Sequence, residues 1–82
     1  MNLYRCIFVL LEHNNLESNM FVRALDERSA REQTLEIFKR TLEQHLIPNA
    51  KYHQIVALSS EEEMKEYSLM MKSRNNSNKK LN

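Results

Sequence analysis

The chain of 82 residues has room for one hydrophobic core and one domain, which excludes multidomain enzymes. Hydrophobic residues make up 41% and charged residues 28%, a balance that favours a folded globule over a disordered chain. The formal net charge of +1 leaves no strong overall field, which argues against a protein that coats nucleic acid.

The sequence contains no glycine, and this absence excludes several phosphate-binding motifs. Walker-type loops, dinucleotide-binding turns and nucleophile elbows need glycine where the backbone takes positive φ or approaches a ligand closely. No other motif indicates a cofactor or a small-molecule substrate. We therefore predict a protein without a cofactor.

The apolar residues near the start form neither a membrane span nor a secretory signal. Residues 6–11 are uncharged but far fewer than the roughly 20 apolar residues that a span requires. Polar residues 12–15 follow where a signal would have a small-residue cleavage site. The lone cysteine, Cys6, cannot form an internal disulfide, which agrees with a reducing compartment. We predict a cytoplasmic protein that does not bind membranes.

Residues 3–11 are rich in β-branched and aromatic side chains and predict a strand. Both faces of this strand are largely apolar, so we expect it to be central and covered on both sides. Residues 12–18 read as a loop, in which Asn14 and Asn15 can take the left-handed conformation that glycine normally supplies.

Residues 19–25 fit either a strand or one face of a helix. We prefer the strand because Ser29 and Glu32 have the spacing of a capping box, which starts a helix downstream and leaves residues 19–25 free to pair with the first strand. The helix is expected to end at Pro48. Its core-facing positions are Leu35, Phe38, Leu42 and Leu46, with Thr34 and Ile37 on the flanks.

Residues 52–58 predict a third strand, and Ser60 with Glu63 forms a second capping box. The helix that follows is expected to run to about Lys72, and residues 73–82 to form a disordered basic tail outside the domain of residues 1–72. The inner stripe of this helix would be Met64, Tyr67, Ser68 and Met71.

Together these elements predict an α+β fold of the order β-β-α-β-α. The long helix would return the third strand parallel to the second and beside the first, which gives a three-stranded sheet of order 2-1-3 with both helices on one face. One sheet face would then stay open, although the first strand is apolar on both sides. We therefore expect another copy of the chain or a partner protein to cover that face. Either face could be the open one. If the face that contains Cys6, Phe8 and Leu10 meets the helices, the open face carries Arg5, Ile7, Val9, Phe21 and Arg23, with Tyr52 as a further member.

The function that this pattern favours is a small, non-catalytic interaction or regulatory protein of the adaptor or inhibitor type, acting as a homodimer. Cys6 could act as a nucleophile with His13, His45 or His53 as base, but Cys6 lies in the most hydrophobic run and is expected to be buried. The histidine spacings match no zinc pattern, so we predict no metal site.

Nucleic-acid binding is the alternative function. Three basic residues, Arg74, Lys79 and Lys80, lie in the tail and could contact phosphates together with Arg5 and Arg23. Acidic residues are interleaved with the basic ones along the long helix, as in Glu36 and Arg40, which is typical of a solvated face rather than a nucleic-acid interface.

Overall fold

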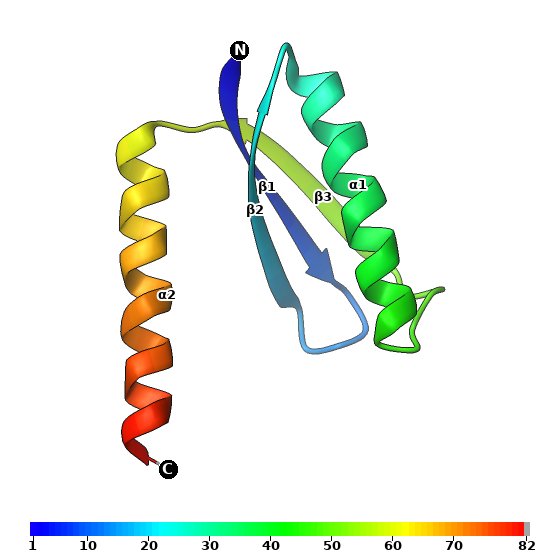
Figure 1. Ribbon diagram of the computed structural model, residues 1–82. Coiled ribbons are helices and arrows are strands. Elements are labelled where there is room, and N and C mark those ends of the chain that lie inside the picture. Colours follow the sequence, from blue (N-terminus) through cyan, green and yellow to red (C-terminus); the bar gives the residue numbers. More distant parts are fainter. Residues whose placement is uncertain (82) are drawn as a thin grey trace.

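The chain folds into one three-stranded sheet and two helices, and the computed structural model describes the backbone of residues 1–81 and the side chains of residues 1–72. Strand β1 lies between β2 and β3 and is antiparallel to both (Figure 1). The predicted α+β class, element order and sheet order are confirmed. The elements are β1 (Asn2–Leu10), β2 (Leu16–Ala24), α1 (Glu27–Gln44), β3 (Tyr52–Leu58) and α2 (Glu61–Leu81).

The β1–β2 hairpin contains the predicted left-handed residues. Asn14 has φ 58° and Asn15 has φ 53°, and the two residues turn the chain so that Leu16 pairs with Leu10. Asparagine tolerates this region better than other non-glycine residues because its short side chain can hydrogen-bond locally. Strand β2 starts earlier than the predicted residue 19, because the ladder continues down to the turn.

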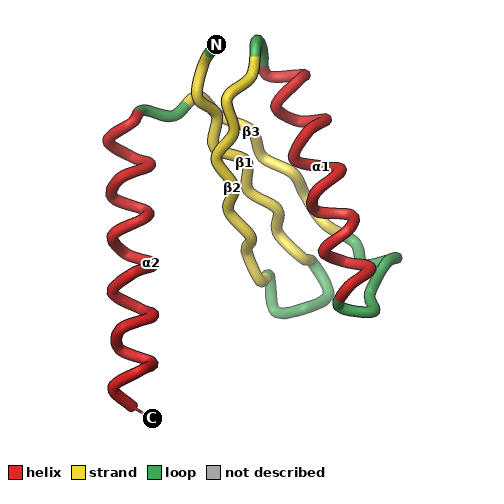
Figure 2. Tube along the Cα trace, viewed as in Figure 1, coloured by secondary structure: helices red, strands yellow, loops and turns green. Residues whose placement is uncertain are grey.

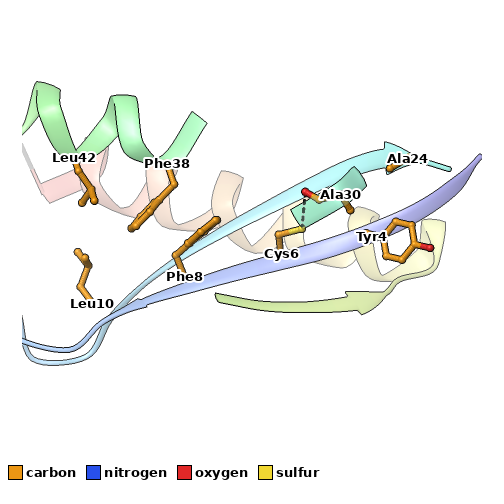
Figure 3. Packing of buried hydrophobic residues seen from close by; sticks show 8 residues of the cluster. All are labelled: Tyr4, Cys6, Phe8, Leu10, Ala24, Ala30, Phe38 and Leu42. Atoms are coloured by element: carbon orange, nitrogen blue, oxygen red, sulfur yellow. Dashed lines mark hydrogen bonds between the residues drawn. The ribbon is translucent and has the colours of Figure 1, made fainter. Parts of the chain in front are cut away.

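The inner face of the sheet, which packs against α1, carries the core. Side chains alternate between the faces of a strand, so every second residue of β1 points toward α1. Figure 3 shows Phe8 and Leu10 facing Phe38 and Leu42 of α1, and Cys6 beside Ala30. The buried residues at this contact are Tyr4, Cys6, Phe8 and Leu10 from β1, and Ala30, Thr34, Phe38 and Leu42 from α1.

An aromatic cluster lies at the centre of this core. The rings of Phe8 and Phe38 stack with centroids 4.1 Å apart, and Tyr52 meets both edge-on at 5.8 and 5.1 Å. The prediction that Tyr52 belongs to the open face is therefore wrong. Tyr52 pairs with Leu10, and paired residues point to the same side of a sheet.

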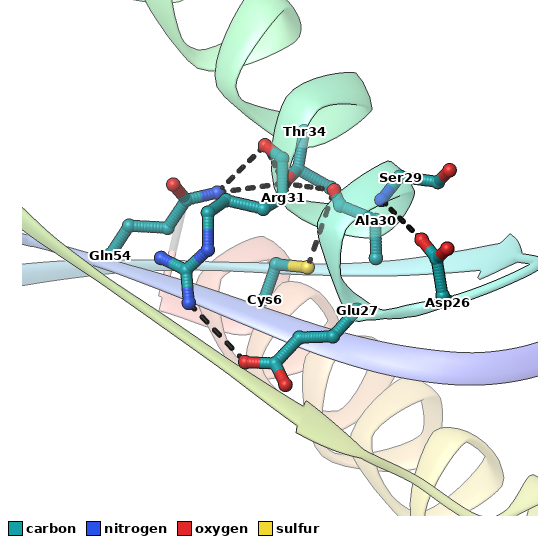
Figure 4. A network of polar contacts seen from close by, with 8 residues as sticks. All are labelled: Cys6, Asp26, Glu27, Ser29, Ala30, Arg31, Thr34 and Gln54. Atoms are coloured by element: carbon teal, nitrogen blue, oxygen red, sulfur yellow. Dashed lines mark hydrogen bonds and ion pairs between the residues drawn. The ribbon is translucent and has the colours of Figure 1, made fainter.

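A partly buried polar network joins β3 to α1 (Figure 4). The Gln54 side-chain amide donates to the Arg31 carbonyl oxygen at 2.9 Å and to the Thr34 hydroxyl oxygen at 3.1 Å. The Thr34 hydroxyl donates in turn to the Ala30 carbonyl oxygen at 2.8 Å. Threonine can therefore occupy a position that is 1% exposed without leaving its hydroxyl unsatisfied.

Helix α1 begins earlier than the Ser29 capping box predicts. Its N-cap is Asp26, whose carboxylate accepts a hydrogen bond from the Ser29 amide at 2.8 Å. The capping-box prediction is wrong because aspartate caps as well as serine, and an Asp26 start adds one more turn above the buried Ala30.

Helix α1 also ends earlier than Pro48. The Ile47 amide donates to the Leu42 carbonyl at 2.9 Å and the Leu46 amide to the Glu43 carbonyl at 3.0 Å, which is a Schellman ending. Leu46 takes the left-handed conformation, with φ 62°, and is 87% exposed. The prediction that Leu46 packs in the core is therefore wrong. The buried stripe of α1 ends at Leu42 and includes Thr34.

We expect Leu46→Gly to raise the free energy of unfolding by about 1 kcal/mol, because a β-carbon is unfavourable at positive φ and this exposed side chain loses no packing. Urea denaturation measures the change. As a control, Lys39→Gly on the exposed side of α1 should lower the free energy of unfolding by about 1 kcal/mol. Destabilisation by Leu46→Gly would contradict the left-handed assignment.

Helix α2 begins at its predicted cap, since the Glu63 amide donates to the Ser60 hydroxyl oxygen at 3.1 Å. The prediction that it shares a face with α1 is wrong. Its Tyr67 ring lies 5.4 Å from that of Phe21, which points away from α1, and α1 and α2 flank the sheet from opposite sides (Figures 1 and 2). The physical reason is space, because α1 already covers the inner face of a narrow sheet.

The described part of α2 differs from its predicted inner stripe. Met64 and Tyr67 are half-buried as expected, whereas Ser68 and Met71 are exposed. The helix continues to Leu81, beyond the end expected near Lys72. The side chains of residues 73–82 lie outside the described residues, so the disordered tail stays a prediction. Within residues 1–81, neither helix combines the length and the apolar character that crossing a membrane would take.

Candidate interaction surface

The outer face of the sheet, which is the side opposite α1, carries all five residues predicted for the open face. Arg5, Ile7 and Val9 alternate with the core residues of β1, and Phe21 and Arg23 lie beside them on β2. Pairing in the sheet thus brings together residues from two separate segments, as the sequence predicted.

Strand β3 adds a residue that the sequence analysis missed. Ile55 pairs with Ile7 across the sheet and is 51% exposed, whereas Ile7 and Val9 in the central strand are half-buried. Side chains alternate between the two faces along residues 52–58, so Ile55 and Tyr52 must lie on opposite faces. Ile55 could therefore have been identified had Tyr52 been assigned to the core, but Tyr52 was predicted on the open face. The apolar strip of the outer face is therefore Ile7, Val9 and Ile55.

Helix α2 lies over the β2 side of the outer face, where Phe21 is half-buried and Arg23 is exposed but paired. Phe21 contacts Tyr67 as described, and the Arg23 guanidinium forms an ion pair with the Glu61 carboxylate. This ion pair is about half exposed on both sides, and exposed pairs stabilise by only about 0–1 kcal/mol. Few contacts hold α2 to the sheet, and the β1–β3 side of the face stays uncovered.

Arg5 lies between the covered and the uncovered parts of the outer face. Its Nε donates to the Asn19 side-chain oxygen at 3.1 Å, which fixes the guanidinium beside β2. Arg5 therefore lies beside the apolar strip, and its role in binding a partner stays a prediction.

A groove of about 530 Å³ separates α2 from the sheet. Tyr67, Met70 and Met71 form its helix wall, and Arg5 and Asn19 form part of its sheet wall. Methionine side chains adapt to different surfaces because they are unbranched and polarizable. The groove extends the apolar strip toward α2 and adds acidic side chains, namely Glu17, Glu63 and Glu66.

A second groove, of about 380 Å³, lies between the hairpin and the end of α1. Its walls include Leu10 and Phe38 from the core and the exposed His13 and His45. The remaining histidine, His53, lies on the outer face of β3. Within the described residues, no three side chains among histidine, cysteine, aspartate and glutamate come together as a metal site would require.

Cys6 is fully buried beneath α1, as predicted. Its Sγ lies 3.9 Å from the Ala30 carbonyl oxygen, and alanine at that position lets the helix approach the strand. His13, His45 and His53 are all exposed, so none of them shares the buried site of the thiol. A general base for Cys6 is therefore not among these histidines.

The charged side of α1 consists of ion pairs with i, i+4 spacing. Glu36 pairs with Arg40 at 3.0 Å, as predicted, and two further pairs join Glu27 to Arg31 and Arg28 to Glu32 at 3.3 Å. Each arginine on this side therefore faces a carboxylate, and the helix presents a mixed, solvated surface. The alternative phosphate-binding residues Arg74, Lys79 and Lys80 lie outside the described side chains.

Comparison of the chain with protein families, with curated proteins and with solved structures finds no match. The outer face and its groove therefore have to be interpreted from their own chemistry.

Proposed function

We propose that this protein is a non-catalytic interaction or regulatory protein, an adaptor or inhibitor, that binds a partner protein through the outer face of its sheet and acts as a homodimer. The observation that carries the proposal is the uncovered apolar strip of Ile7, Val9 and Ile55 beside a helix that protects only the β2 side. Contiguous apolar surface of this kind marks interaction sites in small domains.

The composition of the groove beside the strip supports a protein partner. Aromatic residues, methionine and arginine are enriched at protein interfaces, and here Tyr67, Met70 and Arg5 line the groove between α2 and the outer face. A partner that lies on Ile7 and Ile55 would reach the groove as well, so one continuous surface could bind an apolar ridge of another protein.

Nothing in the described residues favours the nucleic-acid alternative. Arg5 is engaged with Asn19 and Arg23 with Glu61, so binding phosphate would require both to give up their present partners. The groove also contains acidic side chains, which repel phosphate.

A cytoplasmic location is part of the same proposal. It is supported by the lone cysteine, Cys6, because a free thiol that packs in the core agrees with a reducing compartment.

A charge substitution on the outer face tests the proposal. In cell extract, the tagged full chain should elute with its partner at a larger apparent mass, and Ile7→Lys should weaken that complex by about tenfold or more because burying an unpaired charge is costly. Ile37→Lys is the matched control, since Ile37 is an exposed isoleucine on α1, away from the outer face. Circular dichroism checks that both variants fold.

Equal loss of the complex in both variants, or no loss in Ile7→Lys, would contradict the proposal. Retention of the complex by Ile37→Lys alone would support it.

A further inference from the structure

Strand β3 is an edge strand, and its hydrogen-bonding pattern shows which groups remain free. The Leu11 amide donates to the Lys51 carbonyl at 3.0 Å and the Ser59 amide to the Leu3 carbonyl at 2.9 Å, so odd-numbered residues bond to β1 at both ends of the strand. Bonding alternates along an antiparallel pair. The even-numbered residues therefore point their N–H and C=O groups away from the sheet, and these residues are Tyr52, Gln54, Val56 and Leu58.

The β3 edge lacks the charged residues and prolines that usually prevent an edge strand from pairing with another chain. Residues Tyr52–Leu58 contain no proline, lysine, arginine, aspartate or glutamate, and two apolar side chains, Ile55 and Leu58, are 51% and 67% exposed. The opposite edge, β2, carries Glu17 and Arg23 and has α2 beside it. The two edges of the sheet are thus very different, and β3 is the edge suited to pairing.

We propose that β3 pairs antiparallel with β3 of a second copy, across a two-fold axis at Ile55, to form a continuous six-stranded sheet. This inference deepens the proposed function, because it names the contact that makes the homodimer and leaves the outer face free for the partner protein. We choose a second copy as the partner of this edge because two β3 strands are complementary to each other, both in their backbone hydrogen bonds and in their side chains.

The backbone of the strand restricts the register to pairings of even-numbered residues with even-numbered residues. With the axis at Ile55, Tyr52 lies opposite Leu58 of the second copy and Gln54 lies opposite Val56 of the second copy. All of these residues have free outward groups, so each outward N–H and C=O gains a partner. A shift of one residue would place them opposite residues whose groups already bond to β1.

The side chains fit the same register. The two Ile55 side chains become neighbours on the outer face, and Leu58 meets Tyr52 of the second copy on the inner face. The two exposed apolar side chains of β3 therefore both gain an apolar neighbour along the sheet, and no like charges meet because the strand carries none.

The pairing also closes at two copies. Once both β3 edges are used, the outermost strands are the two β2 strands, with their charges and the neighbouring α2 helices. The outer faces of the two copies then lie side by side, with Ile7 and Ile55 of each copy forming one apolar strip across the axis.

Charge variants at Ile55 test the two-fold axis. The wild-type chain should have the mass of a dimer in light scattering, and Ile55→Lys and Ile55→Glu should each raise the dimer dissociation constant by about tenfold or more, because like charges meet at the axis. A one-to-one mixture of the two variants should regain the dimer mass. A monomeric wild-type chain, or variants and mixture with the same mass, would overturn the proposal.

Cysteine variants test the register. In a Cys6→Ala background, Ile55→Cys should form an intermolecular disulfide with oxidised glutathione as the oxidant. His53→Cys and Ala57→Cys should cross-link efficiently only when mixed, because these positions lie opposite one another. Equal cross-linking of every variant with itself would overturn this register.

Failure of this inference is distinguishable from failure of the proposed function. Ile7→Lys should keep the dimer mass while losing the partner protein, because Ile7 lies in the central strand away from the edge. If Ile7→Lys dissociates the dimer and the Ile55 charge variants do not, the edge pairing is refuted and the outer face itself holds the second copy.

Discussion

Replacing Phe38 with alanine is expected to lower the free energy of unfolding by about 3–5 kcal/mol. Phe38 is 2% exposed, stacks on Phe8 at 4.1 Å and meets Tyr52 at 5.1 Å, so the substitution removes the aromatic contacts of α1 with both β1 and β3. A small domain has about 5–15 kcal/mol of stability in total, so much of it would be lost. Urea denaturation followed by circular dichroism measures the change.

Phe21→Ala is the matched control for this prediction. Phe21 is half-buried and contacts Tyr67 of the loosely held α2, so its loss should cost less than half as much. If the two substitutions destabilise the protein equally, α2 packs on the sheet as firmly as α1 does, and the outer face is a second core instead of a binding surface.

The Cys6 thiol is expected to react with a thiol reagent on the order of 10³-fold more slowly in the native protein than in the unfolded chain. Cys6 is 0% exposed and lies beneath α1, so the reagent reaches the sulfur only when the helix leaves the sheet. The rate of modification by an aromatic disulfide reagent, with and without denaturant, measures the protection.

An exposed thiol gives the comparison for this rate. Ser68→Cys in a Cys6→Ala background places a thiol on the exposed side of α2, where it should react almost as fast as in the unfolded chain. Fast reaction of Cys6 in the native protein would contradict its structural role and would reopen the case for a cysteine nucleophile.

The strands and the hairpin were predictable because local signals agree with the tertiary contacts there. Residues 52–58 form the expected strand, and Asn14 and Asn15 turn the hairpin as expected in a chain without glycine. The sheet order followed from one rule: two strands of the same sheet that are connected through a helix run parallel to each other. β2 and β3 are connected in this way by α1, and they lie on either side of β1.

The helix ends and the position of α2 were not predictable from local patterns. Asp26 and Ser29 are both good caps, and the choice between them depends on how far α1 must extend to cover the sheet. Leu46 was misplaced because the four-residue spacing of the core stripe continues past the turn that actually ends α1. The side of the sheet that α2 takes depends on α1 already covering the other side.

The residues of the outer face were predicted in part. Alternation along β1 correctly grouped Arg5, Ile7 and Val9 on one face. The extent of the exposed strip could not be outlined from the sequence, because it requires knowing that α2 lies over the side of the outer face that contains Phe21.

The most direct test of the outer face as an interaction surface is photo-cross-linking in the cells that express the protein. A benzoylphenylalanine at position 53 would replace His53, which is exposed on the outer face, and one at position 39 would replace Lys39 on the exposed side of α1. We expect an adduct with another protein from position 53 and little from position 39. Equal yields from the two positions, or no adduct from position 53, would contradict the proposed function.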